Sequence, residues 1–95
     1  MIELGTQDIF KALSDPTRRE ILSLLKEKRM SAGEIVAKFN MTGATISHHL
    51  SILKDAGLVR VEREGTFIYY EINLSVMEEI FTWFSNLRGD KEDEA

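Results

Sequence analysis

The sequence predicts a mainly α fold with about five helices and one small β-hairpin, and two observations lead to this fold class. Apolar residues recur at helical spacing up to residue 57 and again after residue 73, whereas between 58 and 72 they alternate with polar residues. Four residues that favour the position just before a helix also stand where such segments would begin. The chain of 95 residues has no internal repeat or dividing linker, so we expect one domain spanning 1–95.

The first two helices are predicted at about 7–13 and from residue 16 to about residue 28. Asp15 can cap the second helix, and Pro16 suits the first helical position because it has no amide proton to leave unbonded. Helical periodicity places the apolar residues of this helix inward and its basic residues outward. The inward residues are Ile21, Leu22, Leu24 and Leu25, and the outward residues are Arg18, Arg19, Lys26 and Lys28.

Two further capped helices follow in close succession. Ser31 and Glu34 form a capping box at the start of a short helix that ends near Phe39. Thr42 can cap the next helix, at about 43–56, and Gly57 can adopt the left-handed conformation that ends it. Two capped helices joined by about three residues are typical of a helix-turn-helix, whose second helix contacts DNA bases.

The second helix of this pair has two different faces. One is apolar apart from a single histidine, and the other carries short polar side chains with no acidic residue between 42 and 54. Such a face can lie close to the floor of a DNA major groove, although a solvated amphipathic helix would have a similar pattern. The inward residues are Ile46, His49, Leu50 and Leu53, and the outward residues are Thr45, Ser47, His48 and Ser51.

A two-stranded hairpin is predicted at about 58–72, directly after this helix. Val59 and Val61 alternate with polar residues, and Gly65 can provide the positive φ angle of a tight turn. A hairpin in this position is a wing, whose tip can reach the DNA backbone or the minor groove beside the helix. The hairpin can also simply cover the core, and both roles are compatible.

The last helix, at about 74–88, starts after Asn73 and carries more apolar surface than a small domain needs for its own core. This surface either covers the first helix completely or meets a partner. The segment 89–95 is an acidic tail. The apolar stripe consists of Met77, Ile80, Phe81, Trp83, Phe84 and Leu87.

The charged residues that give the net charge of −4 are unevenly distributed along the chain. Residues 11–70 hold ten Lys/Arg and seven Asp/Glu, so the middle of the chain is mildly basic and the ends are acidic. The absence of cysteine excludes disulfides, thiolate metal ligands and cysteine nucleophiles. No apolar run is long enough to cross a bilayer, and the start lacks a signal-peptide pattern, so we expect a cytoplasmic protein without membrane insertion.

Four motifs together resemble the ArsR family of winged-helix repressors. They lie at 12–19, 46–50, 53–59 and 65–70, and the second of them reads Ile-Ser-His-His-Leu. The similarity covers nearly the whole chain, from about residue 10 to residue 87. Within the family, the chain is most similar to the small cysteine-free autorepressors of the SdpR type.

The resemblance implies a homodimer that binds a palindromic double-stranded DNA operator and represses transcription until an effector loosens the complex. It places His49 at a packing position. The DNA-facing residues that it implies are Thr42, Gly43, Ala44, Thr45, Ser47, His48, Ser51, Arg63, Gly65 and Thr66. The dimer interface that it implies involves Ile9, Phe10, Leu13, Met77, Ile80, Phe81, Phe84 and Leu87.

The sequence departs from the metal-sensing members of that family. Those members carry a cysteine pair before the DNA-contacting helix, or a His/Asp set on the last helix. Here 32–38 has neither cysteine nor histidine, the last helix has no histidine, and Glu78 and Glu79 alone would hold a metal weakly. We therefore predict no metal and no cofactor, and release of DNA by a non-metal effector or an anti-repressor protein.

Two other classes of function are alternatives to a DNA-binding repressor. A winged-helix module that mainly binds protein is the closer alternative, and the polar outward face of the second helix argues against it. An enzyme is disfavoured because His48 and His49 are adjacent on a helix, so their side chains diverge by about 100°. No nucleophile–base set or phosphate-binding glycine loop is present either, so we predict no catalytic residues.

Overall fold

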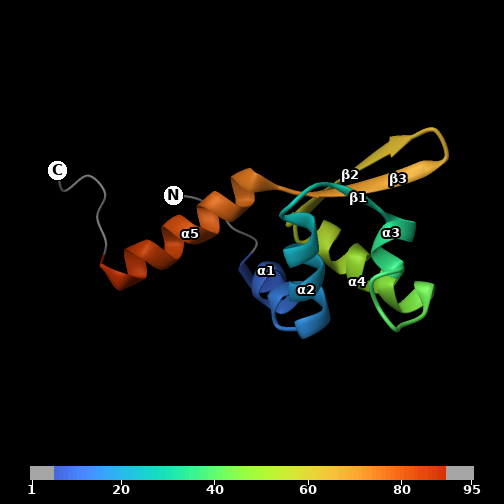
Figure 1. The fold of residues 1–95 in the computed structure, drawn as a ribbon. Coiled ribbons are helices and arrows are strands. Elements are labelled where there is room, and N and C mark those ends of the chain that lie inside the picture. The colour runs from blue at the N-terminus through green and yellow to red at the C-terminus, as the bar shows by residue number, and fades with distance from the viewer. Residues whose placement is uncertain (1–5, 90–95) are drawn as a thin grey trace.

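The computed structural model describes residues 6–89 and contains five helices and three strands within that range (Figure 1). The predicted mainly α fold with a hairpin is confirmed. The helices are α1 (Thr6–Leu13), α2 (Pro16–Leu25), α3 (Ala32–Val36), α4 (Gly43–Asp55) and α5 (Leu74–Arg88). The strands are β1 (Met30–Ser31), β2 (Val59–Glu64) and β3 (Phe67–Ile72).

The sheet has three antiparallel strands in the order β1-β3-β2, so the prediction of a two-stranded sheet was incomplete. β2 and β3 form the predicted hairpin, with Val59 opposite Ile72 and Glu64 opposite Phe67. The additional strand β1 pairs Met30 with Tyr70 and Ser31 with Tyr69. A strand of two residues is too short to show an alternating pattern, and it forms because the middle strand offers it free backbone groups.

Two helices end earlier than the sequence predicts. α2 ends at Leu25 and not near residue 28, and α3 ends at Val36 and not near Phe39. After α3 the chain tightens, because the amides of Lys38 and Phe39 each bond to the carbonyl three residues earlier. The predicted segment therefore still turns as a helix would, with fewer residues per turn at its end.

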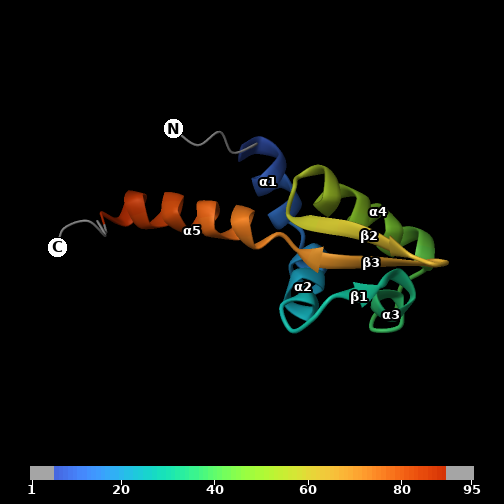
Figure 2. The ribbon, with the colours of Figure 1, turned by 90° about the horizontal axis from the view of Figure 1, so that it is seen from above.

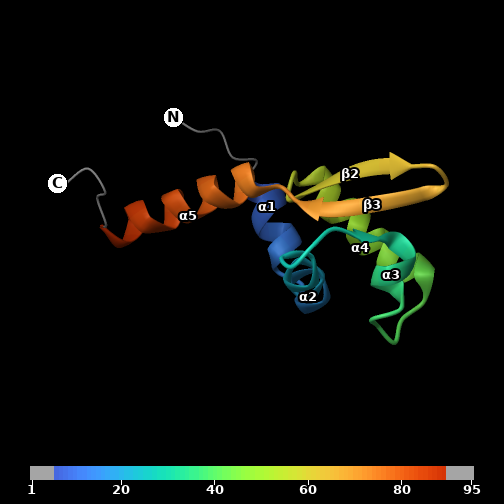
Figure 3. The ribbon, with the colours of Figure 1, turned by 45° about the horizontal axis from the view of Figure 1, so that its top comes forward.

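The core lies between α1, α2, α3, α4 and the sheet, and the hairpin crosses above α3 and α4 (Figure 3). Ile21, Ile35, Ile46 and Leu50 are almost completely inaccessible to solvent. α5 contributes one buried residue, Ile80, and then projects away from the body (Figure 2). The molecule is accordingly elongated, with principal extents of 48 × 25 × 21 Å.

Candidate DNA-binding surface

Helix α4 is capped at both ends as the sequence predicts. At its start the hydroxyl of Thr42 accepts a hydrogen bond from the amide of Thr45 at 3.1 Å. At its end Gly57 has φ +80°. The amide of Gly57 donates to the carbonyl of Lys54, and the amide of Leu58 donates to the carbonyl of Leu53. These two bonds form a Schellman motif, so both the length and the exit direction of α4 are fixed by local chemistry.

The outward face of α4 gathers the residues that the sequence assigned to DNA. The opposite face carries Ile46, Leu50 and Leu53, which are buried. The start of α4 and the tip of the hairpin lie at the end of the molecule opposite the projecting end of α5 (Figures 1 and 2). The exposed outward residues are Thr42, Gly43, Ala44, Thr45, Ser47, His48 and Ser51.

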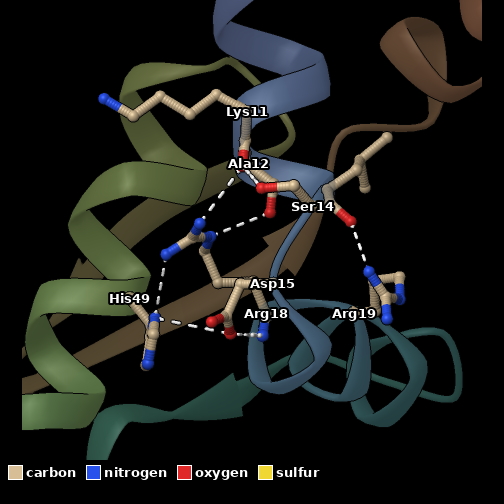
Figure 4. A network of polar contacts seen from close by, with 8 residues as sticks. Lys11, Ala12, Ser14, Asp15, Arg18, Arg19 and His49 are labelled. Atoms are coloured by element: carbon tan, nitrogen blue, oxygen red, sulfur yellow. Dashed lines mark hydrogen bonds and ion pairs between the residues drawn. The ribbon is translucent and has the colours of Figure 1, made fainter.

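His49 takes part in a polar network that the sequence did not reveal (Figure 4). Arg18, predicted to point outward, is only 8% exposed. Its Nε donates to the carbonyl of Ala12 at 2.8 Å, and its Nη2 donates to that of Lys11 at 3.1 Å. Its Nη1 lies 3.1 Å from Nδ1 of His49. The guanidinium thus caps the end of α1 and contacts the middle of α4.

The contact with Arg18 constrains the tautomer of the His49 ring. A guanidinium has donors only, so Nδ1 can accept from it only in the neutral tautomer that carries the ring proton on Nε2. Asp15, whose carboxylate is 3.9 Å from Nδ1, is the third member of the network. Partial burial raises the pKa of Asp15, but the hydrogen bond from the amide of Arg18 and, when its ring is protonated, the charge of His49 outweigh this effect, so the pKa of Asp15 is lowered overall.

The hairpin forms a wing with an exposed tip. Glu64 pairs with Phe67, which leaves a loop of two residues, Gly65 and Thr66. Gly65 has φ +64°, as required of the first loop residue in a type II′ hairpin turn. Arg63, Gly65 and Thr66 are all exposed. Val61 is also exposed, although the alternation suggested burial.

A second network that the sequence did not reveal crosses the outer face of the sheet. The Arg29 cluster consists of Arg29, Glu62, Glu64 and Tyr69. Both terminal nitrogens of Arg29 contact Glu64, at 3.0 and 2.9 Å, and Nη1 also contacts Glu62 at 3.4 Å. The guanidinium carbon lies 4.2 Å from the centre of the Tyr69 ring. Hydrogen bonding and charge from Arg29 outweigh desolvation and lower the pKa of Glu64.

Hydrogen bonds also connect the end of α4 to the start of α5. The amide of Asn73 donates to the carbonyl of Leu58 at 3.0 Å, and its side-chain Nδ2 donates to the carbonyl of Gly57 at 3.2 Å. The side-chain oxygen of the same residue accepts from the amide of Val76, which caps α5 as predicted. One residue therefore joins the segment that leaves α4 to the helix that projects from the body.

The predicted dimer residues divide into two groups. Ile9 and Ile80 lie in the core of the single chain, and Leu13 and Met77 are partly buried against it. The others form what we call the apolar α1–α5 surface: exposed Phe10, Phe81, Phe84 and Leu87. Phe10 and Trp83 approach to 5.5 Å between ring centres, and Trp83 and Phe84 to 5.2 Å, so aromatic contacts connect α1 with α5.

The residues that the structure describes hold neither a cluster of metal-binding side chains nor a membrane-spanning helix. Among residues 6–89 no three His, Cys, Asp or Glu side chains come together as a metal site would require. Glu78 is exposed and Glu79 partly so. No helix in this part of the chain is long and apolar enough to cross a membrane.

Comparison with known proteins agrees with this geometry. Residues 15–61 match the model of the bacterial regulatory protein, arsR family. The chain is 47% identical to the transcriptional repressor SdpR of Bacillus subtilis over 90% of its own length and 97% of that protein. It is 36% identical to the arsenical resistance operon repressor of Staphylococcus aureus over 82% of its length and 73% of that protein.

Solved structures give the same result. The crystal structure of an ArsR family transcriptional regulator superposes with a TM-score of 0.82 at 26% identity, and the match covers 88% of this chain and 92% of that one. NolR from Sinorhizobium fredii superposes with a TM-score of 0.69 at 30% identity, over 90% of this chain and 86% of that one. The chain therefore belongs to the ArsR family of bacterial regulatory proteins and is a winged helix-turn-helix, DNA-binding transcriptional regulator, not an enzyme.

Proposed function

We propose that this protein is a cytoplasmic homodimeric repressor that binds a palindromic operator through α4 and the wing. The observation that carries this proposal is the outward face of α4, where Thr45, Ser47, His48 and Ser51 are exposed and no carboxylate intervenes. Short polar side chains allow the helix axis to lie deep in the major groove, where hydroxyl and imidazole groups can bond to base edges. SdpR and the staphylococcal relative are both named as repressors, which supports the direction of regulation.

Different residues would perform different tasks on the operator. Thr45 and His48 are three positions apart on α4, so both can point into the groove, where they would distinguish bases. Arg63 at the wing would contact phosphate and would raise affinity for all sequences alike. The mildly basic middle of the chain fits a modest contribution from non-specific attraction.

The second copy would cover the apolar α1–α5 surface. Phe81 and Leu87 are 69% and 66% exposed, and a small soluble domain rarely leaves such a patch in water. A two-fold dimer would present two reading helices to half-sites about one DNA turn, roughly 34 Å, apart. Since the chain has no thiolate and residues 6–89 hold no clustered metal ligands, a non-metal effector or an anti-repressor protein would release the operator.

The decisive experiment is selection of bound fragments from random double-stranded DNA with the purified full chain. We expect an imperfect inverted repeat to be enriched. The variant Thr45→Ala/His48→Ala should lose this enrichment, whereas Ser23→Ala, a change at an exposed position of α2, should retain it. If the wild-type protein enriches no sequence, the proposal is wrong, and a winged-helix module that mainly binds protein becomes the better interpretation.

A further inference from the structure

We propose that Arg29 is a positioning residue for DNA binding, which holds the wing against the body and neutralises two wing carboxylates that would otherwise repel the DNA backbone. This inference rests on the proposed contact between the wing and DNA. Arg29 lies outside the helix-turn-helix and the wing, and it does not need to touch DNA in order to act. It acts through Glu62 and Glu64.

The side chain of Arg29 connects the start of β1 with β3 and β2. Arg29 immediately precedes β1, its guanidinium lies over Tyr69 on β3, and it reaches Glu62 and Glu64 on β2. Tyr69 pairs directly with both Ser31 and Glu62, which places these side chains on the same face of the sheet. The contact with Glu64 uses two nitrogens and two oxygens, an arrangement that restricts direction as well as distance.

The exposure of this cluster argues against a role mainly in stability. The side chains of Arg29, Glu62 and Glu64 are 36%, 60% and 49% accessible to solvent. Ion pairs this exposed contribute little to folding, and the backbone ladder of β2 and β3 already holds the hairpin together. What the cluster does control is the charge that the wing presents and the direction of its first strand relative to the body.

The local charge makes this control relevant to DNA. β2 carries two arginines and two glutamates, so its own net charge is zero, and Glu62 and Glu64 flank Arg63. Alternation along the strand puts both carboxylates on one face and Arg63 on the other, so the negative charges are adjacent to Arg63 in the same exposed part of the wing. Without Arg29, the two carboxylates would oppose the attraction that Arg63 provides.

The test uses a fixed 30-base-pair duplex of mixed sequence. Neutralisation of the two wing carboxylates by Arg29 should affect binding to any DNA sequence, so no operator is required. Arg29→Ala should bind this duplex about fivefold more weakly than wild type at low salt, with a smaller difference at high salt. Arg29→Lys should restore part of the affinity, since it keeps the charge but not the two-point contact. Lys26→Ala, which removes one exposed positive charge outside the wing, is the matched control and should have a smaller effect.

The combined variant Arg29→Ala/Glu62→Gln/Glu64→Gln separates the explanations. If Arg29 acts by masking the carboxylates, this variant should bind within about twofold of wild type. If it binds as weakly as Arg29→Ala, then Arg29 contacts phosphate itself and the inference is wrong. An Arg29→Ala variant indistinguishable from Lys26→Ala would also overturn it, whereas failure of the proposed function would appear in the operator selection, where the wild-type protein would enrich no sequence.

Discussion

The Nη1 atom of Arg18 lies 3.1 Å from Nδ1 of His49, and this contact joins the first turn of α2 to the middle of the DNA-reading helix (Figure 4). The same guanidinium donates hydrogen bonds to two carbonyls at the end of α1. This helix contributes Phe10 to the apolar α1–α5 surface. Three helices therefore meet at one buried cation. The position of α4 relative to α1 depends on it.

Replacing Arg18 with methionine should lower the free energy of unfolding by about 1–3 kcal/mol. The buried carbonyl of Ala12 would lose the hydrogen bond from Arg18, whereas the carbonyl of Lys11 would keep its bonds from the amide and hydroxyl of Ser14. Urea denaturation measures the change. Arg19→Met is the control, because its single bond to the carbonyl of Leu13 is exposed, and we expect a change within about 0.5 kcal/mol.

The lowered pKa of Asp15 predicts a dependence of stability on acidity. A carboxyl group whose pKa is lower when folded stabilises the protein above its ordinary value of 3.8 and loses this contribution as pH falls through the folded value. Asp15→Asn keeps a good helix cap but cannot ionise. Wild type should therefore be more stable than this variant near pH 6, and the difference should shrink toward pH 3. Thermal unfolding curves across that range provide the measurement, and a constant difference would contradict the assignment.

The two exposed candidates on α4 should show base specificity. Thr45→Ala or His48→Ala should each weaken binding to the selected operator by about 1–3 kcal/mol and affect random DNA much less. A His48→Ala variant that loses affinity equally for the operator and for random DNA would instead indicate that His48 contacts phosphate.

The apolar α1–α5 surface predicts the assembly state. Wild type should sediment as a dimer at micromolar concentration, and Phe84→Asp should give monomers or aggregates, because a charge without a partner is costly in a desolvated interface. Phe67→Asp introduces the same change at a wing position that is 58% exposed, against 49% for Phe84, and should remain dimeric. A wild-type monomer under these conditions would refute the proposed interface.

Metals should leave DNA binding unchanged. The chain has no cysteine, and residues 6–89 hold no cluster of three metal-binding side chains. Fluorescence anisotropy with the operator should therefore give the same affinity with low micromolar Zn²⁺, Cd²⁺ or arsenite as without. A loss of binding that a chelator reverses would reveal a site that neither the sequence nor the described residues indicate.

Features governed by neighbouring residues were predicted well from the sequence. Asp15, Ser31, Thr42 and Asn73 each cap the helix that follows, since a side chain and an amide three residues away determine a cap. Gly57 ends α4 for the same kind of local reason. The polar outward face of α4 was also predictable, because helical periodicity alone sorts exposed from buried positions.

Features that join distant segments were not predicted. The pairing of β1 depends on Tyr69 and Tyr70, about 40 residues further along the chain. Arg29 meets Glu64 across a separation of 35 residues, and Arg18 meets His49 across 31. An arginine on a short amphipathic helix is normally exposed, so only the packing of α1 against α2 and α4 explains why Arg18 is buried.

The hydrogen bonds from Asn73 to Gly57 and Leu58 give α5 the properties of a lever. The helix of 15 residues is about 22 Å long, and its first turn is bonded to the segment that leaves α4. If the two copies of α5 cross near their C-terminal ends in the dimer, a change of about 5° in the crossing angle would displace the N-terminal end of α5, which is bonded to the segment after α4, by about 2 Å. A shift of that size exceeds the tolerance of a hydrogen bond to a base edge. An effector would then need only to alter an angle at the dimer, far from DNA, to end repression.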